Sequence, residues 1–355
     1  MKLVLRTVIV DRYVYFRNKR KWNFLTISLF ILSYIMYLKY TFGPGFSFTK
    51  WDWNDDISCY LNEDDALPPI TSVAPTTRSI FFTETSCNIN VWEPKDACAV
   101  ESAARTHPNW SVYVLFTNPL KKEELEKNKI MRVLQKVPNV KLARVNIEEY
   151  AMGTPVEGFV SGGGLNETEC PIMLTEGLVK YLTLQKWGGV FMEKDLIVTK
   201  PLTSLTRNWV PKLNEDSIGS GILAFSKDEV GKNVADSALR YLIKNHKTFD
   251  CTNGENVMSK IVQQECTIPD PVSKSAANCN GFEIYGSQFF YPVDAKNVGD
   301  YFEAGELPGY DKAYTYYLWS RLTCGTGFPK FYGSRLGKLA KRHCPTTYSA
   351  FSIKF

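Results

Sequence analysis

The sequence predicts an α/β protein with a mainly parallel sheet that helices cover on both faces. Three observations support this class. Short apolar runs alternate with amphipathic helical stretches along most of the chain, which is typical of strand–helix–strand units. Turn and capping residues separate these segments. With 355 residues, the chain is long enough for one large core plus appendages.

The first 42 residues predict a cytosolic tail (1–21) followed by a transmembrane anchor (22–42). The tail carries seven Lys and Arg against the single acid Asp11, and the 17 residues that follow it carry no charge. Such a run, extended to residue 42, can just span a thin bilayer. The basic excess before the run indicates that the N-terminus is cytosolic. The alternative is a cleaved signal peptide, but no small-x-small cleavage site follows the apolar run.

The charge balance of the remaining chain excludes a nucleic-acid-binding surface. The whole sequence has 42 Lys and Arg against 37 Asp and Glu, and removing the first 21 residues leaves 35 against 36. The body therefore has no basic footprint. Residues 43–78 are rich in Pro, Asp, Asn, Ser and Thr, which predicts a flexible stem. We therefore expect a lumenal domain over residues 79–355.

The cysteine pattern agrees with a lumenal body. None of the nine cysteines belongs to a C-x-x-C pair, which disfavours zinc and thioredoxin-like sites. An oxidising lumen permits disulfides, and the plausible local pairs are Cys266–Cys279 and Cys87–Cys98. Spacing does not fix the connectivity, and the odd count leaves at least one cysteine unpaired or intermolecular. Two sequons, at Asn109 and Asn166, are candidate glycosylation sites.

Each segment of the body is predicted from its local pattern, in chain order. Alternating or continuous apolar runs predict strands over 79–83, 110–116, 140–145, 196–198 and 219–225. Amphipathic periodicity predicts helices from Pro94 to about 107, over 121–137, from Pro171 to the Gly188-Gly189 pair, and over 228–245 and 254–263. The Gly-rich stretch 158–164 matches neither a P-loop nor G-x-G-x-x-G, so we expect a mobile loop there.

The stretch from Trp187 to Pro201 holds the candidate site. Glu193 and Asp195 lie two residues apart between two apolar runs. An isolated E-x-D triplet is most often a solvated loop, but unpaired charges between apolar runs are costly. Carboxylates at a strand end suit an oxygen-ligated divalent cation that holds a phosphate.

Two further groups of residues bear on function, the aromatic residues and the histidines. Aromatic residues gather over 289–292 and 313–319. They predict core packing first, and a sugar-stacking surface only if the acidic pair lies nearby. The three histidines lack metal-ligand spacing, and no G-x-S-x-G is present, so a lectin-like or hydrolytic domain has little support.

Six stretches, in the right order and spacing over residues 79–355, resemble one known family. They are Ser79-Ile-Phe-Phe-Thr-Glu-Thr-Ser86, Glu101-Ser-Ala-Ala-Arg-Thr-His-Pro108, Gly188-Gly-Val-Phe-Met-Glu-Lys-Asp195, Gly219-Ser-Gly-Ile-Leu-Ala-Phe225, Phe290-Tyr-Pro292 and Cys344-Pro-Thr-Thr347. The chain is similar to the alpha-1,4-galactosyltransferases and alpha-1,4-N-acetylgalactosaminyltransferases, a family of type II Golgi enzymes. Several motifs in series make this a specific resemblance.

The resemblance implies a GT-A fold, a UDP-Gal or UDP-GalNAc donor and Mn²⁺. The implied reaction moves the sugar to the 4-hydroxyl of a terminal sugar on a glycosphingolipid, with the alpha configuration retained, at the Golgi membrane. Glu193 and Asp195 stand at the D-x-D positions as metal ligands. The implied catalytic residues are Glu193, Asp195, Lys180 and Tyr317. The implied donor-binding residues are Thr83, Ser86, Gly188, Gly189, Ser220 and Gly221, and the implied acceptor residues are Gly254 and Trp319.

The departures from the family pattern support an alternative. The family's S-D-x-x-R, aligned without gaps, becomes Glu176-Gly177-Leu-Val-Lys180 here, and Lys lacks the planar fork of Arg. The first metal-motif Asp is Glu193. Ser220-Gly221, Gly254-Glu255 and Tyr317-Leu-Trp319 replace Asn-Gly, Gly-Pro and His-x-Trp. The alternative is a non-catalytic GT-A pseudoenzyme that binds a nucleotide, a glycan or a partner glycosyltransferase in the Golgi.

Overall fold

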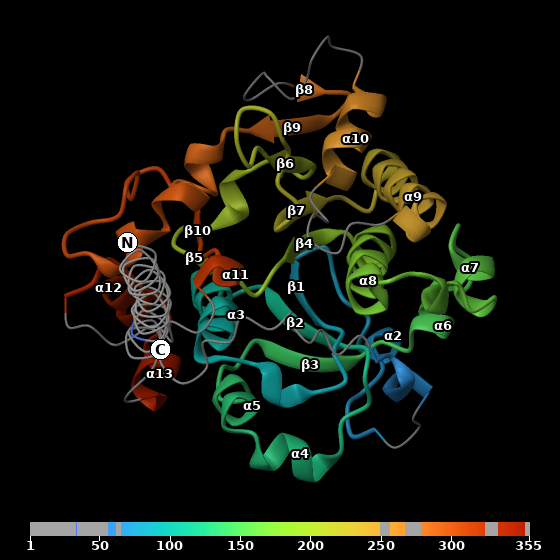
Figure 1. Cartoon of the computed structure of the whole chain (residues 1–355), viewed down its shortest axis with the longest axis horizontal. Helices are drawn as coiled ribbons and strands as arrows, with labels where there is room; N and C mark the ends of the chain where they lie inside the picture. Colours follow the sequence, from blue (N-terminus) through green and yellow to red (C-terminus); the bar gives the residue numbers. More distant parts are fainter. Residues whose placement is uncertain are drawn as a thin grey trace, which may run out of the picture. The chain divides into compact units, whose positions relative to one another are not determined.

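An eight-stranded mixed sheet forms the centre of the computed structural model, which describes residues 33, 56–61, 65–248, 256–266, 278–323 and 333–351. The strand order β3-β2-β1-β4-β7-β6-β9-β8 can be followed upward in Figure 1. The strands are β1 (Ser79–Glu84), β2 (Ser111–Phe116), β3 (Val140–Arg144), β4 (Gly189–Met192), β6 (Trp209–Pro211), β7 (Ile222–Phe225), β8 (Asn278–Cys279) and β9 (Phe282–Tyr285). A two-stranded sheet pairs β5 (Leu196–Val198) with β10 (Thr315–Tyr317).

The strand directions explain why the sheet is mixed. Strands β3, β2, β1 and β4 are parallel neighbours, as the alternating pattern predicted. Strand β7 then runs antiparallel to β4, and β6 antiparallel to β7, before β6 and β9 pair in parallel. The parallel arrangement is therefore limited mostly to the half of the sheet that ends at β4.

Helices cover both faces, as expected for strands with continuous apolar runs. The α-helices are α2 (Ile70–Val73), α3 (Pro94–Thr106), α4 (Lys122–Lys127), α5 (Lys129–Leu134), α6 (Ile147–Ala151), α7 (Glu157–Ser161), α8 (Pro171–Trp187), α9 (Glu229–Lys244), α10 (Asn256–Glu265), α11 (Ser320–Thr323), α12 (Arg335–His343) and α13 (Pro345–Ala350). The 3₁₀ helices are η1 (Ser58–Leu61), η2 (Ile89–Val91), η3 (Gly164–Glu167), η4 (Leu202–Ser204), η5 (His246–Thr248), η6 (Ser287–Phe289) and η7 (Ala295–Phe302).

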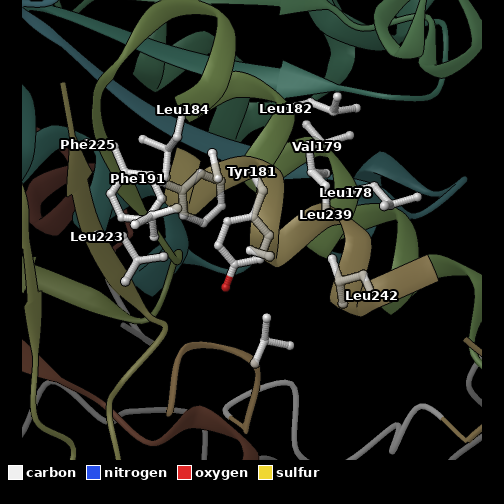
Figure 2. Close-up of a cluster of buried hydrophobic side chains, with 14 of the residues drawn as sticks. Leu178, Val179, Tyr181, Leu182, Leu184, Phe191, Leu223, Phe225, Leu239 and Leu242 are labelled. Carbon is white, nitrogen blue, oxygen red and sulfur yellow. The ribbon is translucent and has the colours of Figure 1, made fainter. Parts of the chain in front are cut away.

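The core on one face lies between the sheet and the pair α8 and α9, which pack side by side (Figure 1). Figure 2 shows Tyr181 and Leu184 of α8 with Phe191 of β4 and Phe225 of β7 in this cluster. Gly177 allows the two helices to approach, because a Cβ there would lie 3.2 Å from the Leu242 side chain. On the opposite face, α3 and α5 pack on the alternate residues of β1 and β2.

Two predicted elements differ from the structure for local reasons. The helix predicted over 121–137 is divided into α4 and α5, because the Asn128 side chain accepts hydrogen bonds from the N–H groups of Ile130 and Met131 and so starts a new helix. The Gly-rich stretch predicted to be a mobile loop forms α7 and η3 instead, held by the buried Val160 and Leu165.

The part of the expected stem that is described packs against the body. Tyr60 donates a hydrogen bond to the carbonyl of Thr85, and Asp65 forms an ion pair with Arg144 at 3.1 Å. The described stem residues, 56–61 and 65–78, accordingly belong to the same compact unit as the body. The tail and the predicted anchor over 22–42 lie outside the described residues, apart from residue 33. Across the described parts of the chain, no helix is long and apolar enough to cross a bilayer.

The disulfides confirm one expected pair and correct the other. Cys266 pairs with Cys279 as predicted. The predicted Cys87–Cys98 pair is wrong, because Cys87 is bonded to Cys59 and Cys98 is bonded to Cys344. Sequence proximity misled here: Cys98 lies in α3, and the α13 end of the chain folds back against it.

Candidate functional site at the reversal of strand order

The strand order reverses at β1, which has β2 on one side and β4 on the other. In α/β sheets, ligands bind at the carboxyl ends of the strands where the order reverses, because the connecting loops diverge there and leave a crevice. Glu84 ends β1 at this point, and residues 193–195 follow β4. We refer to Glu193, Lys194 and Asp195 as the acidic tip.

Two elements hold the side chain of Glu193, and a third contact holds its backbone. Its Oε1 lies 3.3 Å from Nζ of Lys180 in α8, and its Oε2 accepts a hydrogen bond at 3.0 Å from the Tyr317 hydroxyl in β10. Its N–H donates to the carbonyl of Gly221 at 2.7 Å. A Cβ on Gly221 would lie 3.2 Å from Glu193 Oε2 and 3.1 Å from the Tyr317 ring, so glycine fits this contact best.

Lys180 is a buried ammonium group with several partners. Besides Glu193, it donates to the Ser220 carbonyl at 3.1 Å and lies 5.0 Å above the Phe191 ring. Its side chain is 8% exposed. Burial raises the pKa of Glu176, one helical turn before Lys180, and the charge of Glu193 raises it further against the pull of Lys180. Glu176 therefore belongs to this charge cluster, although the sequence pattern pointed to position 177.

Asp195 is held by Ser320, which the sequence analysis did not single out. The Ser320 N–H donates to Oδ2 at 2.8 Å, and the Ser320 hydroxyl donates to Oδ1. Burial raises the pKa of Asp195, and the charge of Glu193 also raises it, while the two Ser320 bonds lower it. Because Ser320 lies three residues after Tyr317, the last residue of β10, its bonds to Asp195 connect the end of β10 to the acidic tip.

Trp319 has an uncommon backbone conformation beside this unit. Its φ is +54°, in the region that non-glycine residues seldom occupy. The indole N–H donates to the Val293 carbonyl at 2.8 Å, and the ring lies edge-on to Tyr317 at 4.9 Å. Such strained positions persist where the surrounding structure enforces them, often at ligand sites.

The acidic tip fits a divalent cation only with help from a ligand. Two carboxylates in one loop are suitable oxygen donors for a hard cation. All four of their oxygens accept from Lys180, Tyr317 or Ser320, so a cation has to displace some of these partners. Within the described residues, no three His, Cys, Asp or Glu side chains form a metal-binding group. The pair therefore suits a cation shared with a bound phosphate, and not one held by the protein alone.

The expected donor-binding residues do not all lie in one place: Ser86 lies beside Glu84, Ser220 and Gly221 lie beside Glu193, and Thr83 lies within β1. Ser86 lies beyond β1, and both its N–H and its hydroxyl donate to Glu84 Oε1, at 2.9 and 2.6 Å. Ser220 and Gly221 contact Lys180 and Glu193 as described above. Thr83 is only 5% exposed within β1. Gly254, which was expected to contact the acceptor, lies outside the described residues.

Gly188 and Gly189 have a packing role at the start of β4. Their φ values are +65° and +96°, which end α8 and turn the chain into the strand. A Cβ on Gly188 would lie 2.9 Å from the Lys227 nitrogen, and one on Gly189 would lie 2.6 Å from the Ser79 carbonyl oxygen. Glycine is therefore required there for close pairing of the strands.

Lys194 joins the acidic tip to β1 and was also not anticipated. Its ammonium forms an ion pair with Glu84, whose side chain is 4% exposed, and lies 4.8 Å from the Trp92 ring centroid. Burial opposes the charge of Glu84, but Lys194 and Ser86 prevail and lower its pKa. The sequence around Lys194 did not indicate this ion pair, because its partner Glu84 lies 110 residues earlier in the chain.

A cavity of about 1240 Å³ lies apart from the acidic tip, at the carboxyl end of β3. Its lining includes Tyr60, Arg144, Tyr150 and the exposed sequon residue Asn166. Arg144 donates to main-chain carbonyls and pairs with Asp65, so its charge is already used. The second sequon residue, Asn109, is exposed in the turn after α3.

The fold and the site together define an α/β protein with its polar groups at the carboxyl ends of parallel strands. Comparison with known proteins narrows this class. The family profile described as "Alpha 1,4-glycosyltransferase conserved region" matches residues 227–351, which include Tyr317, Trp319 and the Cys344-Pro-Thr-Thr347 stretch. This match confirms the resemblance predicted from the motifs.

Full-length comparisons agree with the profile. Lactosylceramide 4-alpha-galactosyltransferase of Homo sapiens is 27% identical over 296 residues, covering 81% of each chain. Alpha-1,4-N-acetylglucosaminyltransferase of Homo sapiens is 21% identical over 279 residues, covering 76% of this chain and 80% of that one. The solved galactosyltransferase LgtC covers 78% of this chain and 97% of its own at 13% identity, with a TM-score of 0.42, too low to establish a shared fold.

Proposed function

We propose that this chain is a hexosyltransferase of the alpha-1,4 type that transfers Gal or GalNAc from a UDP-sugar to the 4-hydroxyl of a terminal sugar on a glycosphingolipid. The proposal includes a GT-A fold, retention of the alpha configuration and a type II anchor in the Golgi membrane. The observation that carries it is the convergence of Glu193, Asp195, Lys180 and Tyr317 at the reversal of strand order, in a chain that carries the conserved region of the alpha-1,4-glycosyltransferases.

The residues would divide the work by their chemistry. Asp195 and Glu193 would hold Mn²⁺, which when bound offsets the charge that develops on a diphosphate leaving group. Lys180 holds Glu193 in place and brings a positive charge to the same crevice. Tyr317 and the neighbouring edge-on Trp319 offer aromatic surface next to the tip, where the apolar face of an acceptor sugar can stack.

The test is a transfer assay with the full chain produced in a secretory pathway. Given Mn²⁺, UDP-Gal or UDP-GalNAc and a neutral glycosphingolipid, it should form an alpha-linked product. Asp195→Ala should abolish transfer, while Asp216→Ala, in an exposed turn, should not. Failure to form any product with either donor, or turnover indifferent to Asp195, would overturn the proposal.

One observation favours a second candidate, a non-catalytic protein that keeps the nucleotide site. Gly177, where the family pattern has Asp, faces Leu242 of α9, and a Lys replaces the Arg three residues later. A site altered in this way suits binding without turnover. Calorimetry that detects Mn²⁺-dependent UDP binding, together with no transfer from any UDP-hexose, would favour this candidate.

A further inference from the structure

Lys194 lies between the two strand ends that meet at the reversal of strand order. Its ammonium is paired with Glu84 at the end of β1, while its backbone belongs to the acidic tip after β4. The Lys194 side chain is 26% exposed and that of Glu84 is 4% exposed. The contact therefore connects the segments that follow two neighbouring parallel strands.

The opposite oxygen of Glu84 determines how Ser86 can interact with a ligand. Oε1 accepts the Ser86 N–H at 2.9 Å and the Ser86 hydroxyl at 2.6 Å. The other acceptor within reach of that hydroxyl is the Asn88 carbonyl, at 3.3 Å. In both arrangements the hydroxyl proton is used within the chain, so the oxygen is left with acceptor lone pairs.

The surroundings of Lys194 keep Glu84 charged and fixed. The Trp92 ring lies 4.8 Å from the ammonium, and the pairing with Glu84 raises the pKa of Lys194 against the effect of burial, so the lysine stays charged. Asp96 at the start of α3 also lies close enough to influence the pKa of Lys194, but burial raises its own pKa to about 7, and its carboxylate accepts the Glu93 N–H at 2.8 Å in the capping box of α3. A buried anion that is paired and hydrogen-bonded on both oxygens has one stable orientation.

We propose that Lys194 is a positioning residue: through Glu84 it presets the Ser86 hydroxyl as a hydrogen-bond acceptor for a nucleoside diphosphate bound at the reversal of strand order. The proposal rests on the proposed function, which places a UDP-sugar there. The matching ligand group is a hydrogen-bond donor of the nucleoside, either a ribose hydroxyl or the imide N–H of uracil. The acidic tip thus acts on both ends of the ligand, with Lys194 toward the nucleoside and the carboxylates toward the diphosphate.

The test is a double-mutant cycle on UDP binding by the full chain, measured by calorimetry with Mn²⁺. Lys194→Met and Ser86→Ala should each weaken binding about tenfold, the usual size for loss of a supporting contact. Combining them should add little, because both remove the same interaction. Lys194→Arg, which can still donate to Glu84, should keep most of the affinity. Lys127→Met, an exposed lysine of α4, serves as the matched control.

A second double variant tests whether Lys194 acts through the orientation of Glu84 and not through its own charge. Lys194→Met with Glu84→Gln removes both charges, but the amide oxygen can still accept from Ser86. We expect it to recover UDP affinity to within about threefold of wild type. A melting temperature that recovers while the UDP affinity stays low would show that the Lys194 charge acts on the ligand directly, and would overturn the proposal. If UDP affinity instead falls about a hundredfold in Lys194→Met with Ser86→Ala, the two residues act independently. That result would overturn the positioning role of Lys194 but not the proposed function. A wild-type chain that binds no UDP would overturn the proposed function as well.

Discussion

Glu193 has one oxygen on an ammonium group and the other on a phenol, and this determines how its charge is balanced. Lys180 neutralises the carboxylate, and Tyr317 adds a neutral donor. Breaking such a pair inside a protein is costly because it leaves an uncompensated charge. Under the proposed function, a metal ion would therefore compete with Lys180 for Glu193, and Asp195 would have to give up a Ser320 contact.

This competition predicts that cation and nucleotide bind together. Mn²⁺ alone should bind weakly, and addition of UDP should strengthen its binding at least tenfold, because the phosphates supply missing oxygen ligands. Lys180→Met should raise the affinity for Mn²⁺ alone, since the competing ammonium is gone. Titration calorimetry with and without UDP measures both effects, with Lys127→Met as the unaffected control. Tight binding of Mn²⁺ without nucleotide in wild type would contradict this prediction.

A second prediction concerns His343, which should make the fold sensitive to acid. Burial, together with the neighbouring charge of Arg342, lowers the pKa of His343 from 6.5 to about 4, and its Nε2 lies 3.0 Å from the Tyr310 hydroxyl. The folded state therefore favours the neutral ring. Its contribution to stability is complete above about pH 6.5 and is lost as the pH falls toward 4. His343→Gln should flatten the dependence of the unfolding free energy on pH in that window, measured by urea denaturation. An unchanged slope would contradict the assignment.

The sequence indicated the site residues that lie close together in the chain. It missed those whose partners are distant in the chain and become neighbours only in the fold. The E-x-D spacing pointed to Glu193 and Asp195 because both lie in one loop. Glu84, Glu176 and Ser320 were missed because their roles depend on contacts set by strand order. No local pattern encodes that the ends of β1 and β4 become neighbours, so the ion pair of Lys194 could not be anticipated.

At the scale of elements, two of the stretches that carried the resemblance turn out to contact each other. Glu101 in α3 is completely buried, and its carboxylate accepts from the N–H groups of Thr346 and Thr347 at 2.9 and 2.7 Å and from the Thr347 hydroxyl at 2.7 Å. The disulfide between Cys98 and Cys344 joins the same two elements. These motifs therefore hold α13 against α3.

Removing that carboxylate should be strongly destabilising. Glu101→Ala leaves two N–H groups and one hydroxyl of the α13 end without their acceptor, so we expect a loss of about 3 kcal/mol or more. Thr347→Val, which removes only the hydroxyl bond, should cost about 1–2 kcal/mol. Thr346→Ala is the matched control, because only the backbone of that residue takes part. Urea denaturation checks the order of the three variants, and equal effects would contradict it.

The predicted helix boundaries were correct where a capping residue and the helical periodicity indicated the same position. Pro94 and Pro171 start α3 and α8, and the Gly188-Gly189 pair ends α8, all as predicted. The antiparallel entry of β7 was not predictable, because an apolar strand carries no mark of its direction. The order of the sheet depends on which apolar faces pack best together, and this is decided by the whole chain.

At the scale of the whole molecule, covalent links tie distant segments to the body. Cys59–Cys87 fixes the segment before β1 to the loop after it, and Cys98–Cys344 closes a separation of 246 residues. A cross-link removes freedom from the unfolded chain, and long loops give the larger gains, about 4–5 kcal/mol. The described part of the expected stem is thereby bound to the body over residues 56–61 and 65–78.

These links predict how the chain behaves in cells. A body in the oxidising lumen should yield non-reduced peptides that join Cys59 to Cys87, Cys98 to Cys344 and Cys266 to Cys279, and those thiols should resist alkylation before reduction. Asn109→Gln and Asn166→Gln should each remove one glycosidase-sensitive mass shift, because both side chains are exposed. Replacing Cys98 and Cys344 together by Ala should lower stability, and the other two links should persist. Freely alkylated thiols and no glycan on the wild-type chain would place the body in the cytosol and contradict the lumenal assignment on which the proposed substrates depend.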